Sequence, residues 1–336
     1  MATAPQPGRS CALRTEGEMN EPPQLTTLGE ALIVMDPLSK GPLRHVGTFE
    51  KHVGGAEFNV AVGLSRLGHR AGWVGRLGDD EFGEEILALG RGEGVDVSRT
   101  IQNPDAPTGL YFKEWRALGQ LRVHYYRAGS AASRMRFADV DVDYLLSGEI
   151  VHLTGITAAL SEGCYDLVDR LISAANDCGV PVSFDVNVRQ QLLKERDPRE
   201  VLEPLAARAD LLFLSEDEAE LLFDGSAPAR IKKARETIRA ETVVVHRADG
   251  AFAVEDGVCE MAGYSVDVVD TVGAGDAFVA GFLSGRLRGL STGECLDMAN
   301  ACGACAVTVP GDLKGLPTEE EVLALRRGLG SQDAGR

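Results

Sequence analysis

A short run near the C-terminal end of the chain, Asp270 to Asp276, combines glycines and a carboxylate in a spacing that suits phosphoryl transfer. Gly273, Ala274 and Gly275 leave the backbone bare just before an apolar helical stripe. The start of a helix presents unpaired N–H groups and a partial positive charge, so it attracts anions. Asp276 would repel a phosphate, but it could take a proton from a hydroxyl group beside one. We therefore predict phosphoryl transfer to an alcohol, with Asp276 as the base and residues 273–275 as the anion cradle. A glycine turn whose Asp caps the next helix is the alternative.

Two more segments place polar side chains where a ligand could reach them. Residues 53–59 lead through two glycines into a helix, and Asn59 offers both a donor and an acceptor, which suits the hydroxyls of a polyol. Asp185, Asn187 and Arg189 follow a two-residue period at the end of a candidate strand, which predicts that they share a face. Burying three polar groups is costly unless they serve a site, so we favour a functional role.

Glu218 follows another candidate strand, within Leu214-Ser-Glu-Asp-Glu218. Its carboxylate could organise a metal ion or the water bound to one, although a solvated helix start explains it nearly as well.

These residues need a scaffold, and the chain alternates short apolar runs with amphipathic, helix-length segments. The candidate strands are residues 27–35, 71–74, 150–153, 180–186, 211–214 and 242–245, and the candidate helices include 58–67, 81–89, 165–178 and 230–239. Continuous apolar strands alternating with helices predict an α/β fold with a parallel sheet covered on both faces. Ligands of such folds bind beyond the carboxyl ends of the strands.

Residues 108–127 break this pattern, because they resemble two alternating strands around a short turn. Leu121, Val123, Tyr125 and Arg127 share one face by the two-residue period. A ribbon of this kind cannot lie inside a parallel sheet, so we predict a small β lid over the site, with residues 41–53 adding further strands. An edge hairpin that only packs is the alternative.

Length and composition exclude several classes of protein. The chain has 336 residues, of which 44% are hydrophobic, and this suffices for a substantial core. Its net charge of −17 disfavours nucleic acid and anionic membranes as partners. No run is long enough to span a bilayer, and residues 1–24 lack the apolar region of a secretory signal. We expect loose tails at 1–24 and 330–336 around one domain at 25–329.

The seven cysteines are scattered, as expected of a reduced, cytoplasmic protein. Cys302 and Cys305 match a C-x-x-C spacing but lie in an alanine-rich, helical run. Helix packing is therefore favoured over metal or redox chemistry.

Together these motifs resemble the ribokinase-like (PfkB) carbohydrate kinases over about residues 26–325. The segments 54–59 and 270–276 are similar to the two signatures of that family, in the same order. The resemblance implies a three-layer αβα sandwich with a mostly parallel central sheet and a projecting β lid. Within the family the chain is most similar to the 2-keto-3-deoxygluconate kinases, on residues 108–115, 125–131, 152–157, 185–189 and 212–220.

The resemblance also implies ATP-dependent phosphorylation of a sugar-acid hydroxyl, with Mg2+ on the phosphates and often a bound K+. Substrate would meet Gly55, Ala56, Glu57, Phe58, Asn59, Tyr111, Tyr125, Arg127, Arg189, Asp276 and Asp312. The nucleotide would lie by Asn187, Arg189, Ser215, His246, Gly250, Gly273, Gly275 and Asn300. Metal ions would lie near Glu218, which the residues themselves also indicate, and near Asp270 and Val272, where the monovalent cation is expected.

We therefore expect a homodimeric or larger kinase of a sugar acid, whose carboxylate Arg127 anchors from the lid. A kinase for fructose or 5-dehydro-2-deoxygluconate is one alternative, and a catalytically silent sugar sensor on the same scaffold is another. The segment 245–251 motivates the sensor. It is one residue shorter than the family's glycine-containing loop and has His246 where a lysine is common.

Overall fold

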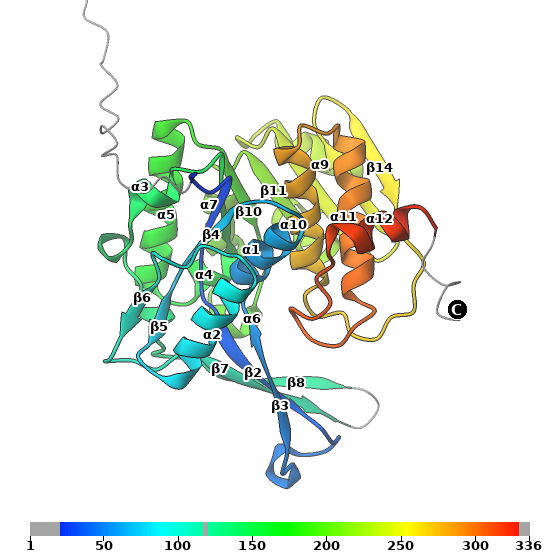
Figure 1. The fold of residues 1–336 in the computed structure, drawn as a ribbon. Helices are drawn as coiled ribbons and strands as arrows, with labels where there is room; N and C mark the ends of the chain where they lie inside the picture. The colour runs from blue at the N-terminus through cyan, green and yellow to red at the C-terminus, as the bar shows by residue number, and fades with distance from the viewer. Residues whose placement is uncertain (1–20, 117–119, 329–336) are drawn as a thin grey trace, which may run out of the picture.

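The computed structural model describes residues 21–116 and 120–328, so most of the two predicted tails lies outside the described residues. An eight-stranded sheet forms the middle of the molecule, in the order β14-β13-β12-β11-β10-β9-β1-β4 (Figure 1). Its strands are β1 Leu25–Leu28, β4 Ala71–Val74, β9 Ile150–Thr154, β10 Val182–Asp185, β11 Leu211–Ser215, β12 Thr242–Arg247, β13 Gly250–Val254 and β14 Val258–Ala262. The six strands from β4 to β12 are parallel, and β13 and β14 are antiparallel, so the predicted mostly parallel sheet is confirmed.

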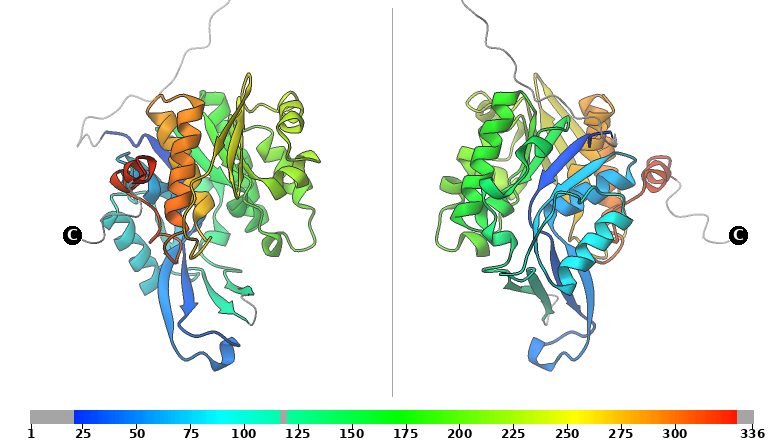
Figure 2. Two further views of the ribbon diagram at one scale, coloured as in Figure 1. Left: turned by 90° about the vertical axis from the view of Figure 1, so that its right-hand side faces the viewer. Right: turned by 60° about the vertical axis from the view of Figure 1, so that its left-hand side comes forward.

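Helices cover both faces of this sheet and make the three layers visible in Figure 2. One layer contains α1 Ala56–Arg66, α2 Glu81–Gly92, α10 Ala274–Leu287, α11 Thr292–Ala306 and α12 Glu319–Arg326. The other contains α3 Val142–Leu145, α4 Gly155–Ala159, α5 Glu162–Cys178, α6 Gln190–Leu193, α7 Pro198–Ala206, α8 Glu216–Phe223 and α9 Pro228–Arg235. Each layer has its own buried apolar cluster against the sheet, because the strands present apolar side chains on both faces.

The lid is a second sheet that projects from the body (Figure 1). It runs β3-β2-β7-β8, from β2 Leu32–Pro37, β3 Phe49–Gly54, β7 Leu110–Trp115 and β8 Leu121–Tyr126. The predicted hairpin within residues 108–127 is present as β7 and β8, apart from residues 117–119, which lie outside the described residues. A two-stranded ribbon, β5 Arg76–Gly78 with β6 Ile101–Asn103, and short 3-10 turns at Leu43–His45, Ala132–Arg134 and Phe137–Asp139 complete the elements.

One prediction about strands was wrong, and one pair of strands was missed. The single strand expected at 27–35 is two strands in different sheets, because the chain leaves the central sheet after Leu28 and enters the lid at Leu32. The hairpin of β13 and β14 was not predicted at all, although Asp256-Gly257 between two alternating runs is a hairpin signal.

The cysteines agree with the packing interpretation. All six that fall within the described residues are free, and Cys302 lies buried on α11. Its sulfur would lie 2.8 Å from a β-carbon added at Gly281, so it fills the contact between α10 and α11. Separately, none of the helices in the described ranges is both long and apolar enough to cross a membrane.

Candidate active site

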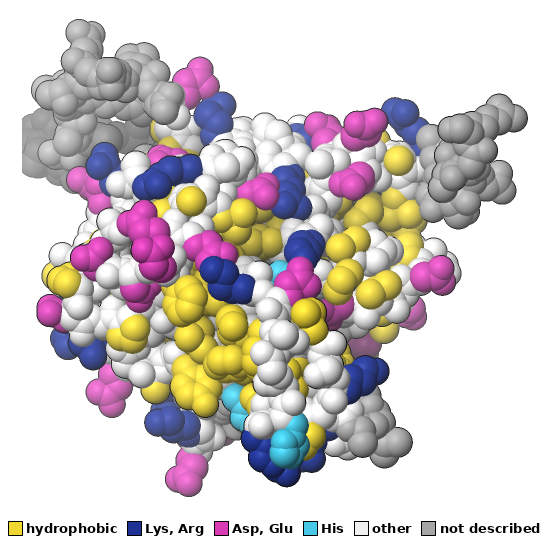
Figure 3. Space-filling view, turned by 60° about the horizontal axis from the view of Figure 1, so that its bottom comes forward, with side chains coloured by type: hydrophobic (Ala, Val, Ile, Leu, Met, Phe, Trp, Pro, Cys, Tyr) yellow, Lys and Arg dark blue, Asp and Glu magenta, His cyan; other side chains and the backbone are white. Residues whose placement is uncertain are grey.

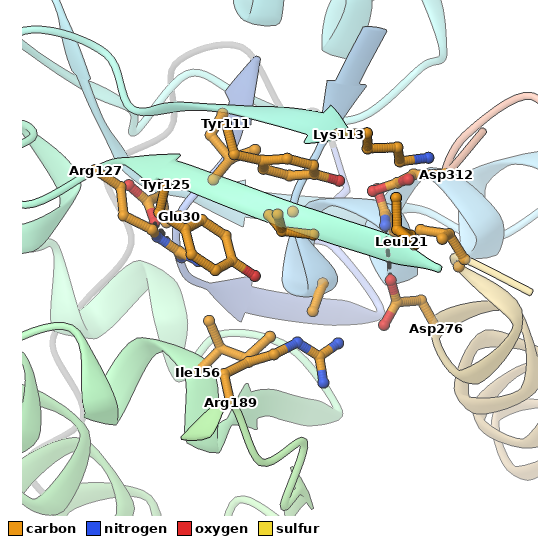
Figure 4. Close-up of a pocket in the computed structure, with 17 residues that line it drawn as sticks. Glu30, Tyr111, Lys113, Leu121, Tyr125, Arg127, Ile156, Arg189, Asp276 and Asp312 are labelled. Atoms are coloured by element: carbon orange, nitrogen blue, oxygen red, sulfur yellow. Dashed lines mark hydrogen bonds and ion pairs between the residues drawn. The ribbon is translucent and has the colours of Figure 1, made fainter. Parts of the chain in front are cut away.

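A cavity of about 200 Å³ lies between the lid and the body of the protein (Figure 4). Its lining is Glu30, Leu32, Gly55, Ala56, Asn59, Tyr111, Lys113, Leu121, Val123, Tyr125, Arg127, Ile156, Arg189, Val272, Gly273, Asp276 and Asp312. Leu121, Val123 and Tyr125 of β8 line it together with Arg127, which directly follows the strand, as the two-residue period predicted. We call this the lid cavity.

Asp276 lies in the first turn of α10 and faces the lid cavity. Burial raises the pKa of its carboxyl to about 7. The side-chain amide of Asn59 opposes that shift, because its Nδ2 donates a hydrogen bond of 2.6 Å to Asp276 Oδ2. A carboxylate whose pKa lies near neutral pH is suited to accept a proton from a hydroxyl group.

The backbone at the start of α10 has the geometry that the predicted anion cradle requires, and we call residues 273–275 the cradle. Gly273 is the N-cap residue with φ of +80°, and a β-carbon there would lie 2.7 Å from the carbonyl oxygen of Asp312. Only glycine fits both constraints. The N–H groups of Ala274 and Gly275 follow in the first helical turn, where the helix itself supplies no acceptors. The N–H of Ala274 makes only a long hydrogen bond, of 3.4 Å, to the carbonyl of Thr271. The cradle is braced by Asp270, whose Oδ1 accepts a hydrogen bond of 3.1 Å from the N–H of Val272.

Two residues that line the same cavity, Asn59 and Asp312, each carry a buried oxygen with no hydrogen-bond partner in the described part of the chain. These oxygens are Asn59 Oδ1 and Asp312 Oδ1. Burial raises the pKa of Asp312 to about 6, and the charge of Lys113 opposes this rise. Because buried acceptors need donors, these two atoms call for hydroxyl groups from a ligand.

Arg127 lines the cavity, but the structure gives it a partner that the sequence did not. Its Nε donates a hydrogen bond of 2.6 Å to Glu30 Oε2, its Nη2 contacts the same oxygen, and both side chains are buried. Ser130 Oγ holds the other oxygen of Glu30 at 2.9 Å. The charge of Arg127 is therefore cancelled within the protein, which corrects the view of it as a free cation on the lid. Its guanidinium also lies 5.2 Å from the ring of Tyr125, which packs edge-to-face on Tyr111.

Arg189 is the cation that keeps its charge available. It forms no ion pair within the described ranges, and its one hydrogen bond goes to the carbonyl of Val188. Its charge lowers the pKa of both Asp276 and Asp312, whose pKa values burial raises. Figure 4 shows its side chain extending across the cavity toward Asp276.

The start of α1 explains which residues of the segment 55–59 reach the cavity. Gly55, Ala56 and Asn59 line it, whereas Glu57 and Phe58 point into the protein. Glu57 Oε1 accepts hydrogen bonds from Thr154 and Thr157, and Phe58 packs edge-to-face on Trp73. The prediction that Glu57 and Phe58 line the substrate site was therefore wrong, because the helical period turns them to the core.

A second cavity, of about 360 Å³, lies beyond the carboxyl ends of β10, β11 and β12, and we call it the strand-end cavity. Its lining is Asp185, Asn187, Arg189, Ser215, Glu218, His246, Thr271, Val272, Gly273, Gly275 and Asp276. Four of these residues, Arg189, Val272, Gly273 and Asp276, also line the lid cavity. The cradle and the candidate base therefore stand on the wall between the two cavities.

Two carboxylates besides that of Asp276, those of Asp185 and Glu218, line the strand-end cavity. Glu218 Oε1 accepts a hydrogen bond of 2.6 Å from the N–H of Val188, and its Oε2 accepts one of 2.8 Å from the N–H of Ser215. Burial raises the pKa of Asp185 well above its ordinary value, and the charges of Glu218 and Asp276 raise it further. A divalent cation held with phosphates would relieve this repulsion, so Asp185 and Glu218 fit an Mg2+ site of one or two carboxylates.

Three predicted nucleotide residues need a correction or a new explanation. Gly250 begins β13 and Asn300 donates hydrogen bonds to the carbonyls of Met261 and Ala262, so neither lines the strand-end cavity. Asn187 does line it, but the chain has already left the strand and holds Asn187 at φ of +40°. Asp185, Asn187 and Arg189 thus meet through a turn rather than through a strand period.

Lys113 and Glu30 were missed. The sequence contained a signal for Lys113, because the period that puts Tyr111 in the cavity also puts Lys113 there. No local signal identifies Glu30, since its partner lies 97 residues away along the chain.

Comparison with known proteins finds relatives over most of the chain. Residues 23–319 match the family model described as pfkB family carbohydrate kinase. The 2-dehydro-3-deoxygluconokinase of Bacillus subtilis is 39% identical over 88% of this chain and 93% of its own length. Fructokinase-1 of rice, Oryza sativa, is 33% identical over 90% of this chain and 97% of its own length. A crystal structure of an E. coli protein in complex with ATP and Mg2+ superposes with a TM-score of 0.84 and 26% identity, covering 91% of this chain and 99% of that one.

Proposed function

Because the chain belongs to the pfkB family of carbohydrate kinases, and is therefore a phosphotransferase that acts on a sugar hydroxyl, we propose that its substrate is a sugar acid. The leading candidate is 2-keto-3-deoxygluconate, phosphorylated by ATP at its terminal hydroxyl to the 6-phosphate. The observation that carries the proposal is the place of Asp276, on the wall shared by the two cavities. The sugar acid would occupy the lid cavity and the nucleotide the strand-end cavity.

The chemistry follows from this placement. Asp276 accepts the proton of the terminal hydroxyl, and the hydroxyl oxygen attacks the γ-phosphorus in line at the shared wall. The bond from that phosphorus to the β,γ-bridging oxygen breaks, and ADP leaves. The N–H groups of Gly273, Ala274 and Gly275 stabilise the charge that develops on the transferring group. An Mg2+ ion, held near Asp185 and Glu218, would neutralise charge on the phosphates.

The lid cavity also supports an acid as the substrate. Asn59 Oδ1 and Asp312 Oδ1 would accept hydrogen bonds from the sugar's hydroxyls. Arg189 would supply the net positive charge for the carboxylate. Arg127, neutralised by Glu30, would direct the carboxylate with its remaining N–H groups. A neutral sugar such as fructose would not need both cations.

We propose that ATP is the preferred nucleotide. We also propose that the protein acts in the cytoplasm, where ATP is available to sugar kinases. His246 lines the strand-end cavity beside Phe278, with 5.5 Å between the two ring centres. It would contact the nucleotide as a neutral side chain, because burial lowers its pKa. A K+ ion near Asp270 and Val272 is not part of this proposal, because the ammonium of Lys113 already lies 3.5 Å from Asp270 Oδ2.

A homodimer would form through the outer face of the lid. Phe49, Phe112 and Tyr126 pack edge-to-face there, with ring centres 5.3 and 5.7 Å apart, and Tyr126 is 65% exposed. Figure 3 shows hydrophobic side chains gathered on the side of the molecule from which the lid projects. Exposed apolar patches of this kind favour association. Sedimentation of the protein and of Tyr126→Ser tests this, since the variant should sediment as a smaller species.

A coupled kinase assay with ATP and Mg2+ tests the substrate. The panel contains 2-keto-3-deoxygluconate, its galactose-derived epimer, 5-dehydro-2-deoxygluconate and fructose. We expect kcat/KM for a 2-keto-3-deoxy sugar acid to exceed that for fructose by about 100-fold or more, the effect of a buried charge left unpaired. Equal or better use of fructose would contradict the proposal. Saturable sugar binding with no consumption of ATP would instead support the sensor alternative.

A further inference from the structure

One charged side chain of the lid cavity has no role in the reaction described above. Lys113 lies on β7 with its side chain 1% exposed, and its Nζ makes no hydrogen bond within the described part of the chain. The ammonium instead stands between two carboxylates, 3.4 Å from Asp36 Oδ2 and 3.5 Å from Asp270 Oδ2. It is also close enough to Asp312 to lower the pKa of that buried carboxyl (Figure 4).

Asp270 links this ammonium to the anion cradle. Its Oδ1 accepts a hydrogen bond from the N–H of Val272, directly before Gly273. Its Oδ2 accepts one of 3.2 Å from the N–H of Gly311, directly before Asp312. The carbonyl of Asp312 in turn packs against Gly273. The charge of Asp270 therefore holds together the two loops that set the backbone of the cradle.

The same carboxylate is where the family resemblance implies a monovalent cation. The residues present do not fit one. A K+ ion gives up its water only for a shell of oxygen ligands. Here one oxygen of Asp270 already faces the Lys113 ammonium, and an ion bound beside it would meet a like charge at close range in a buried site.

We propose that Lys113 is a tethered replacement for that ion, a built-in monovalent cation that positions the anion cradle. Lys113 belongs to β7 of the lid, so the positive charge beside Asp270 comes from the lid. The position of the lid and the backbone conformation of the cradle are therefore coupled through one ammonium group. Lys113 is a positioning residue, and the inference rests on the proposed kinase reaction only for its activity readout.

The first test uses the unaltered protein. Initial rates with ATP and Mg2+ are measured in K+, Na+, NH4+ or tetramethylammonium salts at one ionic strength, with whichever sugar of the panel is phosphorylated. This choice of sugar separates failure of the inference from failure of the proposed substrate. We expect rates that agree within about twofold, because the cation is covalently held. A drop of about tenfold or more in tetramethylammonium would overturn the inference.

The second test removes the ammonium. Lys113→Ala opens space beside Asp270, whereas Lys113→Met keeps the volume without the charge. In tetramethylammonium, Lys113→Ala should lose about tenfold or more of its kcat, and K+ or NH4+ should restore most of it. Lys51→Ala, which removes a half-exposed lid lysine paired with Glu85, serves as the control and should show no such rescue. Equal activity of Lys113→Ala in all four cations would contradict the proposal.

Thermal unfolding gives a readout that does not depend on catalysis. The Tm of Lys113→Ala should be higher in K+ than in tetramethylammonium, while the Tm of the unaltered protein and of Lys113→Met should be the same in both salts. Binding of K+ to the folded variant alone produces this difference. A K+-dependent Tm in the unaltered protein would show that the ion binds despite Lys113, and would overturn the inference.

Discussion

The lid cavity and the strand-end cavity share a wall but offer a ligand different kinds of group. The lid cavity presents side-chain groups, namely the guanidinium groups of Arg127 and Arg189 and two buried acceptors that have no partner among residues 21–116 and 120–328. The strand-end cavity presents backbone N–H groups at the start of α10 and carboxylates at the ends of β10 and β11. Side chains read the pattern of hydroxyls and charge on a sugar, whereas backbone N–H groups and a metal ion bind any phosphate.

This contrast predicts that variants in the two cavities have different kinetic effects. A change on the lid side should alter the choice of sugar, a change on the strand-end side should alter the use of nucleotide, and a change on the shared wall should affect both.

The largest effect short of removing the base is expected on the shared wall, at Gly273. Gly273→Ala adds a β-carbon 2.7 Å from the Asp312 carbonyl and strains a backbone at φ of +80°. We expect kcat to fall about 100-fold with every sugar, since the cradle loses its alignment. Gly289→Ala, at φ of +68° with nothing within 4 Å, carries the same backbone strain away from the site. A comparable loss of activity in that control would remove the cradle from the explanation.

The next largest effects are expected at the two arginines, and they should differ in kind. Arg189→Ala should raise KM for both the sugar acid and ATP, because Arg189 lines both cavities. Arg127→Ala should lower kcat/KM for acids by about 10- to 100-fold and leave KM for ATP unchanged. Steady-state kinetics with both substrates varied decide this.

Arg127→Ala needs a structural control, because it leaves Glu30 buried without its partner, at a cost of roughly 3–5 kcal/mol of stability. The double variant Arg127→Ala, Glu30→Gln removes that cost. If the double variant recovers full use of the acid, Arg127 acts only in folding.

A smaller effect is expected in the pH profile. Asp276 must be ionised to accept a proton, and its pKa is about 7, so kcat/KM should fall as the pH drops below about 7. The hydrogen bond from Asn59 favours the ionised form and lowers that pKa. Asn59→Ala should therefore move the acidic limb to higher pH and lose several-fold more activity at pH 6 than at pH 8. If the acidic limb of the Asn59→Ala profile did not move, the limb would reflect the titration of another group, such as the nucleotide.

The buried carboxylate of Asp276 should also lower the free energy of unfolding. Its pKa in the folded protein, about 7, is raised from an ordinary value of 3.8, so ionisation in the native state is penalised once the pH exceeds about 4, and fully above 7. Asp276→Asn lacks the penalty. Urea unfolding should find the variant more stable by roughly 1–3 kcal/mol at pH 8 and little changed at pH 4. A variant less stable than the parent at pH 8 would contradict the burial cost assigned to Asp276.

The sequence predicted the parts of this site that depend on local pattern. The glycine run before α10, the inward face of β8 and the polar residues beyond β10 and β11 follow from short-range period and turn chemistry. The layered sheet follows from continuous apolar runs.

The features that the sequence did not predict depend on contacts between residues far apart along the chain. The split at Gly29 to Ala31 reflects a change of sheet, the neutralisation of Arg127 requires Glu30, and the tie from Lys113 to Asp270 joins residues 157 positions apart. Glu57 and Phe58 were misplaced because a motif was transferred whole, without the helical period that turns them to the core.

The most direct test of the central claim is a single-turnover measurement with Asp276→Asn. The variant is mixed with saturating sugar acid and ATP–Mg2+, and phosphorylated product is quantified by rapid quench. We expect affinities for both ligands close to those of the parent protein and a phosphoryl-transfer step slowed by about 100-fold or more. A transfer rate near that of the parent protein, with both ligands bound, would show that Asp276 is not the base.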